Sequence, residues 1–213
     1  MPSRHQRALC VRRGEHDHHW NHRPYWAGKT TALNELVKLG GCIFDADAVY
    51  HELLKSNTAL RSELETRFGP LTDERGEFQR KKLGAIVFAD PAALDDLNAI
   101  AHRYVVNAIR EELKKPEIAA LPCAAIDAIA LFESGLADIC DATVAIIAPP
   151  EIRVRRIMER EGISEEYARS RVRAQKPDEY FTSRCGYTLI SDCANPEDFA
   201  ARAKALFEVI LNP

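Results

Sequence analysis

Apolar residues follow two different periods along the chain from Ala27 onward. Continuous apolar runs of a few residues are typical of strands buried on both faces, and they predict strands within residues 42–47, 121–132, 142–148 and 186–191. Apolar residues at helical spacing predict helices over residues 32–39, 48–56, 59–68, 78–88, 91–115, 151–162, 164–176 and 196–211. Strands separated by helices indicate an α/β fold with a mostly parallel, covered sheet.

The first 26 residues fit neither period. They hold five of the seven histidines and five arginines among scattered apolar residues. Three interpretations stay open: a corrupted or frame-shifted start, a disordered basic tail, or a loose zinc or nickel site in the run HDHHWNH. We expect residues 1–26 to be an aberrant, disordered segment without a strand, and residues 27–213 to form the folded domain.

Composition narrows the class of partner. The 213 residues suffice for one sizeable α/β core with a small appended subdomain. A formal charge of -3 indicates no general affinity for nucleic acid or anionic membrane, and the longest apolar run is too short to span a bilayer. The six cysteines form no C-x-x-C and follow no secretory signal. We therefore expect a cytoplasmic protein with reduced thiols and a small-molecule substrate, of undetermined oligomeric state.

A partial phosphate-binding loop stands at the first predicted helix. Gly28, Lys29 and Thr30 match the end of the pattern G-x-x-x-x-G-K-[ST]. Backbone N–H groups at a helix N-terminus attract phosphate, the lysine neutralises it, and the threonine hydroxyl can hold Mg²⁺. The first glycine of the pattern is replaced by Arg23, and no hydrophobic strand is visible before the loop.

Acidic residues follow two of the predicted strands. Asp45 and Asp47 end the first strand, at the carboxyl edge where open α/β sheets bind ligands. A carboxylate there, near Lys29, can accept a proton from a substrate hydroxyl, whereas the alternative role is to cap the next helix. Asp127 ends another apolar run and is either a Mg²⁺ ligand or a solvent-facing acid.

Two arginine-rich helices are predicted near the end of the chain. Helical spacing puts Arg153, Arg156 and Arg160 on one face. Such a cluster on a mobile hairpin fits a lid that clamps polyphosphate, and the alternative is a solvated face balanced by nearby glutamates. The residues His51 and His102 are typical of structural histidines.

From about Ala27 to Leu211 the chain resembles the dephospho-coenzyme A kinase family. The resemblance is carried, in this order, by the segments AGKTTALNELVKLGG, FDADAVYHELL, FQRKKLGAIVFADPAALDDLNAIAH, IDAIALFESGL, RIMEREGISEEYARSRVRAQ and LISD. It implies a P-loop NTPase with a five-stranded parallel sheet of the nucleoside-monophosphate-kinase type. It also implies a helical acceptor-binding subdomain at about 57–115 and a lid at about 151–180.

The resemblance implies ATP-dependent phosphorylation of the ribose 3'-hydroxyl of dephospho-coenzyme A, the last step of coenzyme A synthesis, with ATP and Mg²⁺ as cofactors. Asp47 would be the catalytic base, Lys29 would assist it, and Thr30 and Asp127 would hold the metal. The residues implied for ATP binding are Gly28, Lys29, Thr30, Thr31, Arg156, Arg160, Arg171, Gln175 and Asp192. Ser191 or Asp192 would lie near the adenine-binding loop. Those implied for the acceptor are Asp47, Arg80, Lys81, His102 and Glu133.

The chain departs from the family in its first strand and in the glycines of its loop. Two alternatives therefore stay open beside the implied activity. One is a catalytically impaired relative that binds nucleotide, and the other is a P-loop kinase for a different small metabolite.

Overall fold

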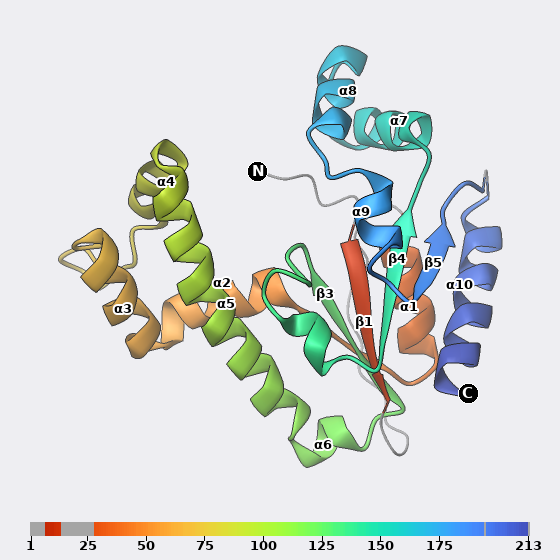
Figure 1. Ribbon diagram of the computed structural model, residues 1–213, viewed down its shortest axis with the longest axis horizontal. Helices are drawn as coiled ribbons and strands as arrows, with labels where there is room; N and C mark the ends of the chain where they lie inside the picture. The colour runs from red at the N-terminus through yellow and green to blue at the C-terminus, as the bar shows by residue number, and fades with distance from the viewer. Residues whose placement is uncertain (1–6, 14–27, 194, 213) are drawn as a thin grey trace.

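The computed structural model of the protein describes residues 7–13, 28–193 and 195–212. Its centre is a five-stranded sheet in the order β2-β3-β1-β4-β5, with helices packed against it (Figure 1). The four strands predicted after Ala27 are confirmed. The strands are β1 (Arg7–Arg13), β2 (Cys42–Asp45), β3 (Cys123–Ala128), β4 (Ala142–Ile147) and β5 (Tyr187–Ile190).

Every helix that the periodicity predicts is also present, with ends that differ by a few residues. Prolines at the first turn and side-chain caps mark several of the starts: the Asp90 carboxylate accepts from the Ala92 N–H, and Pro91 opens the helix that follows. The helices are α1 (Lys29–Lys38), α2 (Ala46–Ser56), α3 (Thr58–Phe68), α4 (Arg80–Ala89), α5 (Pro91–Leu113), α6 (Pro116–Ala119), α7 (Pro150–Glu161), α8 (Glu165–Arg173), α9 (Asp178–Thr182) and α10 (Pro196–Leu211), with a 3₁₀ turn at Leu136–Ile139.

The central strand runs against its neighbours. β1 pairs antiparallel with β3 and with β4, whereas β2 with β3 and β4 with β5 form parallel pairs. The five-stranded parallel sheet implied by the family resemblance is therefore wrong at β1, and the sheet is mixed. The prediction that no strand precedes Ala27 is also wrong for Arg7–Arg13, where Leu9 and Val11 are fully buried.

The remaining residues before Gly28 lie outside the described part of the chain. The predictions of disorder and of a histidine metal site there stay predictions. Among the described residues, no cluster of three or more histidine, cysteine, aspartate or glutamate side chains is arranged to hold a metal ion.

Two apolar cores lie on opposite faces of the sheet. Alternate residues of a strand point to opposite faces, so Cys123 and Ala125 of β3 join α1 and α10, whereas Ala124 and Ile126 join α5 and α9. The fold therefore has three layers, which Figure 1 shows with α1 and α10 on one side of the strands and α5 on the other. The carboxyl ends of the parallel strands β2 to β5 therefore lie between α1 and α10 on one face and α5 and α9 on the other.

Two smaller clusters extend from this frame. Helices α2 to α5 share a third core that includes Leu60, Leu64 and Leu71, and they form the lobe that reaches away from the sheet in Figure 1. Helices α7 and α8 pack on each other through Val154, Ile157 and other apolar residues, as a hairpin beyond the end of β4. They overlap the ranges 57–115 and 151–180, for which the acceptor-binding and lid roles stay predictions.

Two further expectations concern the whole described chain. No helix among the described residues has the length and apolar character needed to cross a membrane. The expectation of reduced thiols holds for Cys42, Cys123, Cys185 and Cys193. It is wrong for Cys140, which is disulfide-bonded.

Candidate active site

A pocket opens at the N-terminus of α1, beside the carboxyl ends of β4 and β5. Gly28 caps this helix and approaches Ser191 so closely that a Cβ built on Gly28 would lie 2.6 Å from the Ser191 Oγ. Only glycine fits such an approach without displacing the serine. The pocket is lined by Gly28, Lys29, Ile146, Ile147, Ala148, Arg153, Arg156 and Ser191.

Lys29 and Asp127 form the ionic centre of the site. The Lys29 ammonium hydrogen-bonds the Asp127 carboxylate at the end of β3, with 14% and 5% of the two side chains exposed. Asp127 also lies in register with Asp45 on the parallel strand β2. The structure thus brings the lysine of the partial loop and both strand-end acids to one edge, as the sequence predicts.

The two acids after β2 have different surroundings. The Asp45 carboxylate accepts hydrogen bonds from the backbone N–H of Asp47 at 2.9 Å and of Ala48 at 3.1 Å, so it caps α2. Asp47 lies in the first turn of that helix, and its side chain takes no part in this cap. The capping alternative is therefore correct for Asp45, and the role of Asp47 as catalytic base stays a prediction.

Thr30 and Thr31 continue α1 behind Lys29 and are partly buried. The first turn of α1, whose backbone N–H groups are of the kind that bind anions, begins at the pocket, which Gly28 and Lys29 line. Arg13, the last residue of β1, pairs with Cys123 at the start of β3, whereas Lys29 contacts the residue near its end. The chain consequently does not pass from β1 into α1 through a short loop at this edge.

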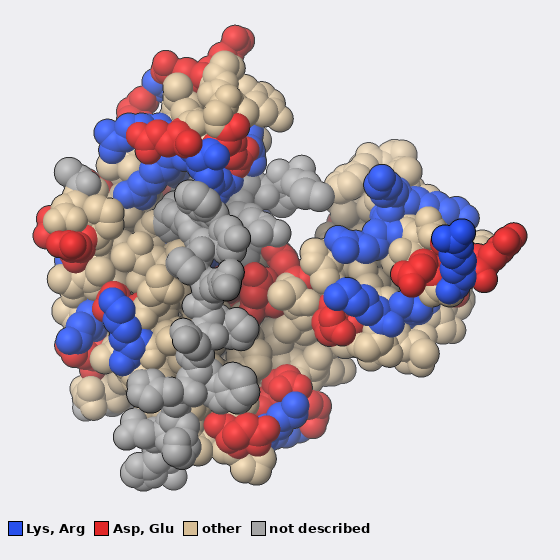
Figure 2. Space-filling model, turned by 180° about the vertical axis from the view of Figure 1, so that it is seen from behind, with Lys and Arg blue, Asp and Glu red and all other residues tan. Residues whose placement is uncertain are grey.

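The expected acceptor residues are spread over the helical lobe and the segment after β3. Arg80 and Lys81 are exposed at the start of α4, where an Arg80 Nη2 lies 3.0 Å from the His51 Nε2. Figure 2, which views the molecule from behind, shows lysine and arginine side chains gathered on this lobe at the right and on the lid at the top. Burial lowers the pKa of His102, with the nearby Glu133 opposing that shift.

Glu133 is engaged with two residues that follow α8. Its carboxylate accepts from the Lys176 ammonium and from the Tyr180 hydroxyl, the latter at 2.6 Å. Burial raises the pKa of Glu133, but these two hydrogen bonds outweigh it and the net shift is downward. Tyr180 in turn lies 3.9 Å from the Lys176 Nζ and 4.1 Å from the Arg184 Cζ, measured to its ring centroid.

The arginines of α7 and α8 separate into groups with different partners. Arg156 reaches the pocket and donates to the Ser191 Oγ at 3.0 Å. Arg160 and Arg171 converge instead on Glu161. Burial is the main cause of a lowered pKa for Arg156, so an anion at this place would stabilise its charge.

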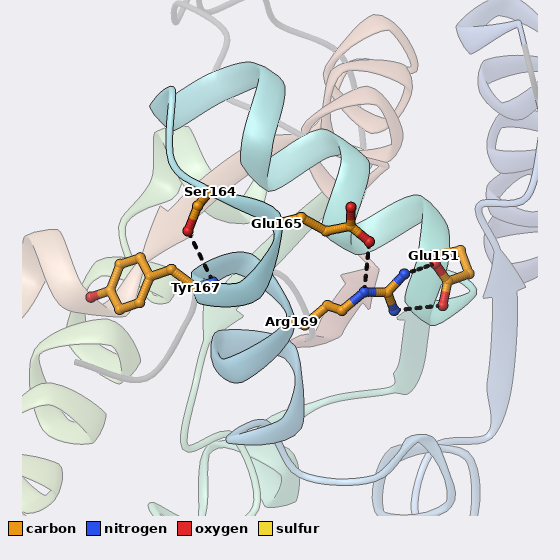
Figure 3. Close-up of polar contacts among 5 residues, drawn as sticks. All are labelled: Glu151, Ser164, Glu165, Tyr167 and Arg169. Carbon is orange, nitrogen blue, oxygen red and sulfur yellow. Dashed lines mark hydrogen bonds and ion pairs between the residues drawn. The ribbon is translucent and has the colours of Figure 1, made fainter.

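Arg169 joins α8 to α7. Its guanidinium donates to both carboxylate oxygens of Glu151 in α7, at 2.9 and 2.7 Å, and to Glu165 at 2.8 Å (Figure 3). The Ser164 hydroxyl caps α8 by accepting from the Tyr167 N–H at 3.3 Å. The hairpin is thereby braced on its exposed side, opposite its apolar contacts.

Arg153 does not lie on the exposed face that helical spacing suggests. It is 7% exposed, donates to the Gln175 Oε1 at 2.9 Å, and forms an ion pair with Asp178 at 3.4 Å. Asp192 lies apart from this group and pairs with Arg202 at 2.6 Å. No sequence pattern points to Asp178, because its contact with Arg153 depends on how the chain returns after α8.

Comparison with known proteins decides the family. The sequence model described as dephospho-CoA kinase matches residues 26–194. The chain belongs to the dephospho-CoA kinase family. It is 34% identical over 180 residues to the dephospho-CoA kinase of Anaeromyxobacter dehalogenans, covering 84% of this chain and 85% of that one. It is 32% identical over 184 residues to that of Geobacter sulfurreducens, covering 85% and 92%.

This dephospho-CoA kinase family catalyses ATP-dependent phosphorylation of dephospho-CoA in the final step of CoA biosynthesis, so the chain is classed as a kinase. Two solved structures are similar in fold. The TT1252 protein of Thermus thermophilus has a TM-score of 0.65 and 32% identity, over 85% of this chain and 91% of that one. A dephospho-CoA kinase from Campylobacter jejuni has a TM-score of 0.62 and 24% identity, over 86% and 91%. The chain therefore has the P-loop NTPase type of α/β fold.

Proposed function

We propose that the protein transfers the γ-phosphoryl group of ATP to the ribose 3'-hydroxyl of dephospho-CoA in the pocket at the N-terminus of α1. The observation that carries this proposal is the position of Lys29. It stands at a helix N-terminus, against Asp127 and in a pocket that Arg156 also lines. Positive charge beside the N-terminus of a helix suits a polyphosphate.

The ATP phosphates would lie against the first turn of α1. Lys29 would neutralise the transferred group, and Arg156 would bind it from the lid side after releasing Ser191. Arg160, Arg171, Gln175 and Asp192 are assigned to ATP by the family pattern, and the first two must leave Glu161 to do so. Closure of the braced hairpin would bring these groups in and exclude water.

Asp47 is proposed as the base that takes the proton of the acceptor hydroxyl. It follows the strand end that lies in register with Asp127, so it stands near the phosphate site. Its neighbour Asp45 caps α2, and the family pattern assigns the base role to Asp47, the second acid of the D-A-D segment. The acceptor would lie toward α4 and α5, where Arg80, Lys81 and His102 offer positive charge and hydrogen bonds.

The residues at this edge fit a Mg²⁺ ion. The Thr30 hydroxyl and the Asp127 carboxylate are hard oxygen donors of the kind that Mg²⁺ prefers, and Asp127 is 4% exposed. We assign these two residues to the ion. When bound, Mg²⁺ supplies charge neutralisation for the β- and γ-phosphates.

A second candidate function is favoured by the direction of β1. A complete phosphate loop follows a parallel strand directly, and here β1 ends at the opposite edge of the sheet from Lys29. A protein with this arrangement can bind nucleotide at the helix N-terminus and still position its γ-phosphoryl poorly. The second candidate is thus an ATP-binding relative with little turnover.

One experiment separates the two candidates. The purified chain is incubated with ATP, Mg²⁺ and either dephospho-CoA or a panel of nucleosides and sugars, and the product is identified by mass and by phosphorus NMR. Calorimetric titration with ATP is run beside it. A 3'-phosphorylated product from dephospho-CoA alone supports the proposal, whereas tight ATP binding without product supports the second candidate, and a product from another acceptor contradicts both.

A further inference from the structure

Arg153 is a buried guanidinium in a helix that otherwise belongs to the lid. It is 7% exposed although α7 projects beyond the sheet. One Nη atom donates to the Gln175 Oε1 at 2.9 Å, and the other lies 3.4 Å from the Asp178 carboxylate. Gln175 lies between α8 and α9, and Asp178 is the first residue of α9. The Arg153 side chain therefore connects α7 to the segment by which the lid rejoins the core.

The contact fixes the orientation of the Gln175 amide. A guanidinium carries only donors, so Gln175 must turn its oxygen toward Arg153 and its Nε2 away. That Nε2 is buried and has no hydrogen-bond partner among the described residues, and the same is true of the Arg153 Nε. Buried donors without acceptors are costly, and a native structure keeps them where an acceptor arrives from elsewhere.

Arg153 also lines the pocket at the N-terminus of α1. The polar side chains of that pocket are Lys29, Arg156, Ser191 and Arg153 itself, and three of them are positive. A ligand that satisfies this set must bring several acceptors and negative charge. A polyphosphate has this chemistry, whereas an uncharged ribose or base supplies too few anionic oxygens.

We infer that Arg153 is a positioning residue that holds Gln175 as a donor for the phosphate oxygens of the nucleotide. By occupying the Gln175 oxygen, it leaves both amide hydrogens for the ligand, and its own Nε–H joins them when the lid closes. Asp178 holds the guanidinium from the other side. This inference rests on the proposed binding of ATP in the same pocket and adds the residue that orients one of its contacts.

The test exchanges the amide and the carboxylate around Arg153. In the double variant Gln175→Glu/Asp178→Asn, Arg153 still faces one carboxylate and one amide oxygen, and the net charge is unchanged. Position 175 has lost both donors. We expect ATP to bind about tenfold more weakly or worse by calorimetry, because hydrogen bonds to charged groups are lost. The melting temperature and the KM for dephospho-CoA should stay close to those of the wild type.

Asp178→Asn alone is the matched control, since it removes the same carboxylate and keeps Gln175. It should bind ATP markedly more tightly than the double variant. Arg153→Lys should retain part of the affinity because it keeps the charge and can still donate to the Gln175 oxygen, and Arg153→Met should not. ATP affinity of the double variant equal to that of the wild type overturns the inference, as does an equal loss for both substrates.

A second variant and a binding assay that is independent of turnover keep the inference testable. Should the exchange fail to fold, Gln175→Met carries the test, because it keeps the side-chain length without charge; unchanged ATP affinity in that variant overturns the inference. Binding is measured by calorimetry, so it does not depend on turnover. A wild type that binds ATP without phosphorylating dephospho-CoA overturns the proposed function alone, and one that binds no ATP overturns both.

Discussion

Lys29 and Asp127 are paired at the carboxyl edge of the sheet, and 14% and 5% of their side chains are exposed. The pair joins the first helical turn of the chain to the end of β3, 98 residues later. Two charges held out of water in this way stabilise a structure little by themselves, because desolvation offsets their attraction. Their juxtaposition therefore points to a role with a charged ligand rather than to stability.

The first prediction concerns Asp127. Asp127→Asn removes the carboxylate that faces Lys29 and the proposed metal ligand, while it keeps the size of the side chain. ATP should bind as well as in the wild type, or better, without Mg²⁺, since one negative charge near the phosphates is gone. Mg²⁺ affinity measured with bound ATP should fall at least about tenfold. An unchanged requirement for Mg²⁺ in the activity assay would remove Asp127 from the metal site.

The second prediction separates the two acids that follow β2. Asp47→Asn should leave ATP affinity nearly unchanged and lower kcat by roughly 10²- to 10⁴-fold, the usual contribution of a positioned general base. Because the partial phosphate loop is expected to lower kcat by itself, the two proteins are compared in a version with a complete loop. Asp47→Asn with near-full kcat would be incompatible with the base role.

Asp45 supplies the matched control for that measurement. Asp45→Ala removes the cap from the Asp47 and Ala48 N–H groups, so it should lower the free energy of unfolding by about 1 kcal/mol. Asp45→Asn should be close to neutral, since asparagine caps as well as aspartate. Chemical denaturation gives both values.

The third prediction concerns the close approach of Gly28 to Ser191. Gly28→Ala places a Cβ 2.6 Å from the Ser191 Oγ and 2.7 Å from its Cβ, so the serine must shift. That shift breaks the hydrogen bond from Arg156 to Ser191 and narrows the pocket. We expect weaker ATP binding and a lower melting temperature. Gly28→Ala/Ser191→Gly should restore much of both, and a double variant no better than the single one would show that the clash is not the cause.

The fourth prediction follows from the partial burial of His102. Burial favours its neutral form and lowers its pKa below the ordinary 6.5, although Glu133 opposes the shift. As the pH falls through about 6.5 the unfolded chain takes up this proton before the folded one does, so stability is lost toward acid. Above that pH the contribution is constant. His102→Gln should make the melting temperature fall less steeply between about pH 6.5 and 5, and an identical slope in both proteins would contradict the assignment.

Most of the fold after Gly28 follows from local pattern. α5 and α10 carry apolar residues at helical spacing behind a proline at the first turn, and β3 and β4 are continuous apolar runs, so each is set by its own residues. β1 is different. Its only described buried side chains are Leu9 and Val11, between arginines at both ends, and its place comes from the gap between β3 and β4 rather than from its own pattern.

The site divides in the same way. Lys29, Asp47 and Asp127 were predictable because each stands at the end of a strand or the start of a helix, where position in sequence determines position in space. The burial of Arg153 could not be predicted, because its partners Gln175 and Asp178 reach it only through the return of the chain after α8. Helical spacing predicts which residues share a face of a helix. It does not predict which distant segment packs against that face.

The fifth prediction concerns the start of the chain and the direction of β1. Arg13 pairs with Cys123 and Ala8 with Ala128, so β1 ends at the edge of β3 opposite to Lys29. In a complete phosphate loop, a parallel central strand leads directly into consecutive backbone N–H groups that surround the phosphates, and glycines permit the close approach. Here Gly28, Lys29 and Thr30 remain for that purpose, and Pro24 offers no N–H.

In-line transfer needs the γ-phosphoryl positioned to about an ångström, and a misplacement of that size costs on the order of 10²-fold in rate. We therefore expect low kinase activity from this protein. A matched protein whose first 26 residues are replaced by a hydrophobic strand and a glycine-rich loop should be faster by about that factor, at similar affinity for dephospho-CoA. Steady-state rates of the two purified proteins, with circular dichroism to confirm that both fold, provide the comparison. Equal rates would mean that the antiparallel β1 and the residues after it position the phosphates as well as a complete loop does.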